Sequence, residues 1–244
     1  MPHSYKTYMD ITLNAFEFNP RSHDVIEKKK EILSSIAVQY NSSPTSILFF
    51  GFSPWILGST CNNIFVTEVS DNAKKLFDQY AIKYTYIDKN DLASTSEKFQ
   101  WAVAGEEYFT FASSESEQRD SVDLLSKLTT DLIVTTLRDY KNQDFKEREF
   151  SHPISIKNSQ ESMIFLEYND YDFNERNAWK SSVFQIHNNE CISYGPFNRC
   201  SMYFKQLAKF SIDAGANKFL VHKNLMYKSL IKKNYEHVIS IPFK

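Results

Sequence analysis

Acidic residues and glycines stand at the ends of several short apolar segments of this sequence. They are Gly51, Glu68, Asp88, Gly105 and Glu106, with Asp139 and Asn142 after a later segment. A glycine lets a backbone approach a ligand closely, and a carboxylate can accept hydrogen bonds or a proton. In an open α/β sheet, ligands bind beyond the carboxyl ends of the strands. The sequence therefore predicts that these residues border a ligand site at one edge of a sheet.

The apolar segments have the character of buried parallel strands. We expect five of them, over residues 46–51, 64–69, 84–88, 99–105 and 131–137. Helical spacing of apolar residues predicts helices at about 24–40 and 73–80, and a third from the capping sequence Ser114–Glu117 onward. A helix at 203–214 ends at Gly215, and strands at 218–222 and 236–241 follow it. This alternation predicts an α/β fold with one doubly wound, seven-stranded, mostly parallel, Rossmann-like sheet.

An insertion interrupts the alternation. Residues 163–168 and 181–187 have strand character with a polar turn between them, which predicts an inserted antiparallel β-hairpin. We find no repeat or linker and expect a single domain over residues 1–244. Its parts are an N-terminal segment and helix, the first strands, the insertion, and a basic C-terminal helix with the closing strands, at 1–45, 46–150, 151–198 and 199–244. Residues before Asp24 are expected to be irregular.

The composition excludes several classes of protein. With 42% hydrophobic and 15% aromatic residues and a net charge of −2, the chain is a packed globular protein rather than a disordered one. Cys61, Cys191 and Cys200 have no CxxC spacing, and the six histidines form no ligand set, so we expect neither a disulfide framework nor a metal. No apolar run approaches the roughly 18 residues of a membrane span, and residues 1–10 lack signal-peptide regions. We therefore expect a cytoplasmic protein without a membrane partner.

Charge is unevenly distributed along the chain. Residues 199–244 contain nine Lys and Arg against Asp213 and Glu236, a balance of +7, which leaves −9 for the remainder. This basic region is either a solvated helix face and tail or a docking surface for nucleic acid or an acidic protein partner.

The complete order of elements resembles the class I S-adenosylmethionine-dependent methyltransferases. The resemblance rests on the five α/β strands, the hairpin, the helix ending in Ala214-Gly215 and the two closing strands, and it covers nearly the whole chain. It implies that the last strand is antiparallel and lies between the fifth and sixth, that residues 46–150 form the cofactor side, and that the hairpin is a lid. The bias toward Phe, Tyr, Asn, Ile and Lys resembles that of AT-rich genomes, including those of viruses that infect marine bacteria.

The resemblance implies which residues bind S-adenosylmethionine. In the segment from Phe49 to Trp55, Gly51 matches the family's cofactor loop, and Trp55 either stacks on the adenine or fills the cofactor's place. Glu68 would accept hydrogen bonds from the ribose, or else cap the helix that starts near Asp71. Asp88 would face the adenine, with Asp91 as a competing helix cap. Gly105 and Glu106 would line the methionine end.

The substrate side has its own candidates. Asp139 would act as a general base and Asn142 would bind substrate, or both would satisfy one another and Arg148 at the surface. His187 on the hairpin is a second candidate base. In the lid interpretation Tyr194 is catalytic and Arg199 binds substrate; the alternative is a turn with an exposed arginine.

Two functions follow from these observations. The first is a methyltransferase acting on a small molecule, because the motifs of base methyltransferases are absent after Val103. The second is a non-catalytic methyltransferase-like scaffold that binds a protein or nucleic acid through its basic C-terminal face.

Overall fold

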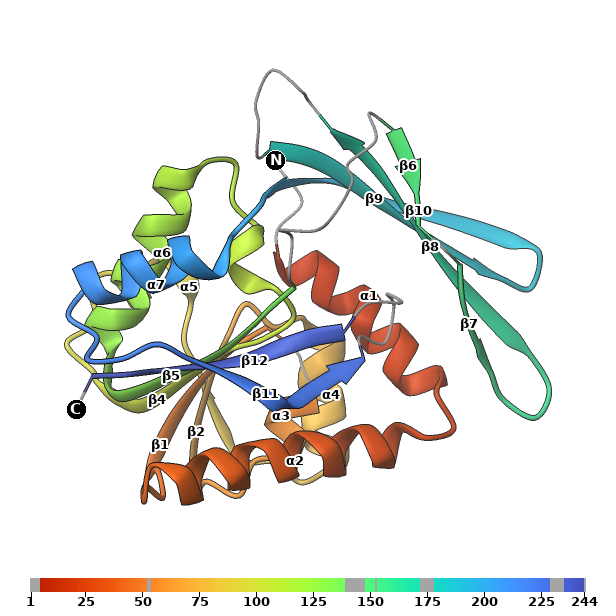
Figure 1. Cartoon of the computed structure of the whole chain (residues 1–244). Coiled ribbons are helices and arrows are strands. Elements are labelled where there is room, and N and C mark those ends of the chain that lie inside the picture. The colour runs from red at the N-terminus through yellow and green to blue at the C-terminus, as the bar shows by residue number, and fades with distance from the viewer. Residues whose placement is uncertain are drawn as a thin grey trace.

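Two β-sheets with helices around them make up the computed structural model of this chain (Figure 1). The structure describes residues 5–51, 54–138, 148–151, 153–171, 178–228 and 235–243. One sheet has seven strands and forms the main body, and the other has five strands and stands beside it.

The seven-stranded sheet has the order β11-β12-β5-β4-β1-β2-β3. Its strands are β1 Ser46–Phe50, β2 Asn63–Thr67, β3 Tyr84–Tyr86, β4 Phe99–Ala104, β5 Thr129–Leu137, β11 Leu220–Lys228 and β12 Tyr235–Pro242. The first five run parallel, whereas β12 lies antiparallel between β5 and β11. The predicted seven-stranded, mostly parallel sheet with an antiparallel last strand is confirmed.

The central strands contain consecutive apolar residues and are buried on both faces. Leu48, Phe49, Val103 and Ile133 are each at most 1% exposed, as expected of parallel strands with helices on either side. Figure 1 shows α2 on one side of the sheet and α6 and α7 on the other. The helices of the main body are α2 Ser22–Gln39, α3 Pro54–Leu57, α4 Asp71–Gln79, α5 Lys89–Leu92, α6 Glu115–Leu128 and α7 Phe204–Asp213, with a 3-10 turn, η1, at Tyr108–Thr110.

The N-terminal part is a helix, α1 Tyr5–Phe18, so the prediction of an irregular start is wrong. Figure 1 shows α1 between the main body and the second sheet. Its buried residues follow one another closely, from Tyr8 and Met9 to Ile11, Thr12 and Leu13, and do not leave one clear polar face. Burial on several sides stabilises this helix in the folded protein, although the sequence lacks the amphipathic pattern of a surface helix.

The second sheet has the order β10-β9-β8-β6, with β7 also paired to β8. Its strands are β6 Arg148–Phe150, β7 Ile154–Lys157, β8 Ser162–Tyr171, β9 Ala178–His187 and β10 Glu190–Cys200. The predicted hairpin corresponds to β8 and β9, and the other strands extend it into a five-stranded sheet. Residues of β9 alternate in burial, with Trp179, Ser181, Val183 and Gln185 buried. This alternation is typical of an antiparallel sheet that packs through one face.

Within the described ranges, no helix has the length and apolar character needed to cross a membrane. The same ranges contain no group of three His, Cys, Asp or Glu side chains placed to hold a metal ion.

The start of α6 provides a test of the local sequence signals. The Ser114 hydroxyl accepts a hydrogen bond from the Glu117 N–H at 3.3 Å, and the Glu117 carboxylate accepts one from the Ser113 N–H at 2.7 Å. We expect Ser114→Ala to lower the free energy of unfolding by about 1 kcal/mol, because it leaves a helix N–H without its acceptor. Urea denaturation measures this. Ser116→Ala, at an exposed position of the first turn, is the control; equal losses in both variants would contradict the capping role.

Candidate functional site

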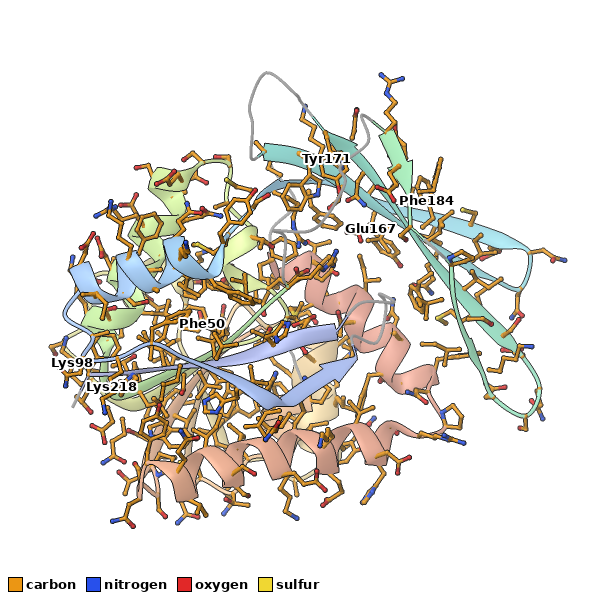
Figure 2. The ribbon with its side chains drawn as sticks, viewed as in Figure 1. Phe50, Lys98, Glu167, Tyr171, Phe184 and Lys218 are labelled. Atoms are coloured by element: carbon orange, nitrogen blue, oxygen red, sulfur yellow. The ribbon has the colours of Figure 1, made fainter. Side chains whose placement is uncertain are left out.

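Four of the residues expected to border a ligand lie where β1, β2 and β4 end, namely Gly51, Glu68, Gly105 and Glu106. Glu68 follows β2, Gly105 to Glu107 follow β4, and Arg138 follows β5. Figure 2 shows side chains around this edge, with Phe50 marking the end of β1 and Glu167 and Tyr171 marking the second sheet. Parallel strands thus bring together residues that are far apart in the sequence.

A cavity of about 190 Å³ lies at this edge. Its walls come from α1, the start of α5, the segment between β4 and α6, α6 itself and β10. The lining residues are Tyr5, Lys89, Tyr108, Phe109, Phe111, Ala112, Ser113, Glu117, Ser121 and Asn198. The lining therefore combines aromatic rings with a lysine and hydroxyl groups.

Glu68 lies directly behind the cavity wall. Its Oε1 is 3.0 Å from the Nζ of the lining residue Lys89, and its charge helps to raise the pKa of Tyr108, after the larger effect of burial. Its other oxygen, Oε2, is buried and has no hydrogen-bond partner among the described residues. Glu68 does not cap α4, because Ser70 does so by accepting a hydrogen bond from the Ala73 N–H. A buried acceptor without a partner is costly, so this oxygen is suited to a ligand hydroxyl.

Gly51 and Gly105 lie against side chains of the protein itself. A Cβ placed on Gly51, whose φ is +66°, would lie 2.6 Å from Met9 and from Tyr5 of α1. A Cβ on Gly105 would lie 2.6 Å from the Trp55 indole nitrogen. Trp55 is completely buried beneath the Lys29 ammonium, 4.3 Å from its ring centre, and is not among the residues that line the cavity.

Tyr5 connects α1 to the strand ends. Its hydroxyl donates a hydrogen bond to the Gly105 carbonyl at 2.7 Å, and its ring lies edge-on to Tyr108 and Phe111. Burial, and then the charges of Glu106 and Glu68, raise the pKa of Tyr5 well above its usual value. Tyr5 therefore stays protonated and donates.

Two buried ionic groups lie directly after β4. Glu106 is 3.3 Å from Lys29 of α2, in a pair that is almost completely buried. Glu107 accepts hydrogen bonds from both Arg138 and Arg199, each at 3.2 Å. Glu106 and Glu107 both have positive φ, 50° and 59°, which is uncommon outside glycine. The ion pairs and the backbone together fix this turn after β4.

Arg199 joins the second sheet to the main body. Its side chain is 0% exposed, and its guanidinium carbon lies 3.9 Å from the centre of the Phe111 ring. Arg199 therefore lies behind Phe111, one of the cavity residues, rather than in an exposed turn.

The remaining candidates occupy other places. Asp88 is exposed and caps α5 by accepting a hydrogen bond from the Asn90 N–H, so Asp88 rather than Asp91 is the helix cap. His187 pairs with Glu161 at 2.7 Å near the end of β9, and the Tyr194 hydroxyl donates to Gln185. Neither His187 nor Tyr194 lines the cavity. Asp139 and Asn142 lie outside the described residues.

Several residues of this edge were not expected from the sequence. They are Tyr5, Lys29, Lys89, Glu107, Arg138 and Glu236. The adjacent pair Glu106-Glu107 after a strand was the one local signal, because it carries two charges into a turn between buried elements. The others depend on contacts between distant segments, such as the 100 residues that separate Tyr5 from Gly105.

Solved structures that resemble this fold include several methyltransferases. An S-adenosylmethionine-dependent methyltransferase from Clostridium acetobutylicum aligns with a TM-score of 0.66 and 8% identity over 88% of this chain and 91% of its own. An amino pentose methyltransferase from Micromonospora echinaspora aligns with a TM-score of 0.62 and 8% identity, over 88% and 90%. For a sugar N-methyltransferase from a Streptoalloteichus species the values are 0.60 and 6%, over 89% and 87%. No protein-family model matches the sequence, and no curated protein matches it significantly.

Glu236 makes the stability of this edge dependent on pH. Its carboxylate accepts a hydrogen bond from Thr136 at 2.5 Å. Burial, and then the charges of Glu106 and Glu107, raise its pKa from 4.5 to about 7. A raised pKa in the folded state means that the folded protein binds the extra proton. Its contribution to stability is therefore complete below about pH 4.5 and lost as the pH rises through 7.

We expect Glu236→Gln to remove this dependence. Between pH 5 and pH 8 the free energy of unfolding of the unaltered protein should fall by on the order of 2–3 kcal/mol more than that of the variant. Urea denaturation at both pH values measures the difference. Glu97→Gln, at an exposed loop position, should follow the unaltered protein. Identical pH profiles for Glu236→Gln and the unaltered protein would contradict this assignment.

Proposed function

We propose that this chain, which has the fold of class I S-adenosylmethionine-dependent methyltransferases, transfers a methyl group from S-adenosylmethionine to a small molecule. The Glu68 carboxylate carries the proposal. It stands at the end of β2, and its buried Oε2 has no hydrogen-bond partner among the described residues. A ribose hydroxyl of the cofactor would supply the missing donor, and a second hydroxyl would share Oε1 with Lys89.

The cavity residues also fit an adenosyl group. Tyr108 and Phe111 offer aromatic surface, while Lys89, Ser113 and Asn198 offer polar groups at the same cavity. Such a combination of apolar walls and a few polar groups is typical of sites for small organic ligands. In this proposal Gly51 and Gly105 adjoin the other end of the cofactor, next to Tyr5 and Trp55.

The elements beside the strand ends favour a small substrate. The second sheet and α1 stand beside the strand ends, and Arg199 ties that sheet to Glu107. A substrate therefore has to enter between these elements. Two of the structural neighbours are an amino pentose methyltransferase and a sugar N-methyltransferase, which supports a small acceptor for this chain as well.

The reaction requires little covalent help from the protein. When bound, the cofactor supplies an electrophilic methyl group on sulfur. The chain would contribute the alignment of the acceptor and the exclusion of water, which together can supply much of the acceleration. Asp139, directly after Arg138 in the sequence, remains our proposal for the group that takes a proton from the acceptor, and Asn142 for substrate binding. The alternative of a non-catalytic scaffold on the basic C-terminal face gains no support from these neighbours.

The role of Glu68 can be tested by calorimetry. We expect Glu68→Gln to weaken the binding of S-adenosylhomocysteine about 10- to 100-fold, because a hydrogen bond to a charged group contributes about 1.5–3 kcal/mol. Glu97→Gln, the same substitution at an exposed loop position that does not line the cavity, is the matched control. It should change the affinity less than about threefold. Unchanged affinity in Glu68→Gln would remove Glu68 from the site.

A further inference from the structure

The two halves of the proposed cofactor site differ in the structure. The side that adjoins Lys89 and Tyr108 is a cavity. The side that adjoins Gly51 is filled by α1, because Tyr5 and Met9 lie where a Cβ on Gly51 would meet them at 2.6 Å. Tyr5 belongs to both sides, since it also lines the cavity. Its ring is therefore the wall that ends the cavity toward Gly51.

The size of the cavity suits only part of the cofactor. Its volume of about 190 Å³ is below the roughly 300–1,000 Å³ of pockets that enclose a drug-sized ligand. Glu68, the residue suited to ribose, adjoins this cavity through Lys89. The nucleoside would thus lie in the cavity, and the amino-acid arm attached to it would have to extend toward Gly51 and Gly105, into the volume of the Tyr5 ring.

Several contacts hold Tyr5 in that volume. The Tyr5 hydroxyl binds the Gly105 carbonyl at 2.7 Å, and its ring centre is 4.9 Å from that of Tyr108 and 5.2 Å from that of Phe111. Tyr5 is only 3% exposed. Further along α1, Asn14 donates a hydrogen bond to Gln185 of the second sheet at 3.2 Å. The helix is therefore fixed at both the main sheet and the second sheet.

We propose that Tyr5 determines which ligands this site accepts. With α1 in place the site takes a nucleoside such as adenosine, and it excludes the amino-acid arm of the whole cofactor until the Tyr5 ring moves. This inference rests on the proposed function, because it assumes that the ligand is an adenosyl compound. It adds that the arm contributes little affinity in the unaltered protein, since its contacts must replace those of Tyr5.

The test compares adenosine with S-adenosylhomocysteine by calorimetry. We expect the unaltered protein to bind the two ligands with affinities within about fivefold. In Tyr5→Ala the affinity for S-adenosylhomocysteine should rise at least tenfold, while that for adenosine changes less than threefold. Tyr5→Phe should behave as the unaltered protein, because the ring rather than the hydroxyl fills the volume. Tyr8→Ala truncates a neighbouring buried ring of α1 that packs on Phe197, and it should not reproduce the gain.

Other outcomes would overturn the inference. If the unaltered protein binds S-adenosylhomocysteine more than tenfold tighter than adenosine, the arm already has its place and Tyr5 excludes nothing. The same conclusion follows if Tyr5→Ala weakens S-adenosylhomocysteine, since Tyr5 would then be a cofactor contact, and the proposed function would stand. The comparison of ligands on the unaltered protein needs no variant, so it holds even if Tyr5→Ala does not fold. If neither ligand binds to any of these folded proteins, the proposed function itself fails.

Discussion

The carboxylate of Glu107 holds the two sheets of this protein together. It accepts hydrogen bonds from Arg138, which follows β5, and from Arg199 on β10. Arg199 and Glu107 are both almost completely buried. Separating them would leave a buried charge without a partner, which is strongly destabilising. Ion pairs of this kind contribute little net stability compared with apolar packing, but they allow few alternative arrangements. The position of the second sheet over the strand ends depends on this constraint.

Other buried charged residues lie beside Glu107 at the ends of the strands. Among the described residues, three carboxylates and three cations from five different parts of the chain gather here: Glu106, Glu107 and Glu236 with Lys29, Arg138 and Arg199. Burial lowers the pKa of Lys29 to about 8, although Glu106 opposes this shift. Its charge and that of Glu236 are therefore both sensitive to conditions near neutrality. The interior beside the proposed site is polar, and its protonation is linked to the packing of α2, β5 and β12.

The main sheet could be predicted from the sequence because strands that are buried on both faces consist mostly of consecutive apolar residues. Residues 47–50 and 132–134 are continuous apolar runs, and each lies within an observed strand. Elements without a clear pattern were not predicted. β6 and β7 have three and four residues, too few for a period to appear. Helix α1 is surrounded by apolar partners, so its sequence lacks the polar face by which a helix is recognised.

The residues of the candidate site also fall into two groups, those that the sequence predicted and those that it did not. Glu68, Gly51 and Gly105 could be anticipated because their positions depend only on where strands end. Tyr5 and Lys29 could not, because each reaches the edge from a helix that precedes all the strands, and its contact lies 100 or 77 residues away. The spacing of residues that are close in the sequence does not predict such a contact. Whether a strand end is open to a ligand is thus decided by elements that the strand sequences do not describe. Here the same ring of Tyr5 bounds the cavity and covers Gly51, so ligand access to the edge is a property of α1 as much as of the sheet.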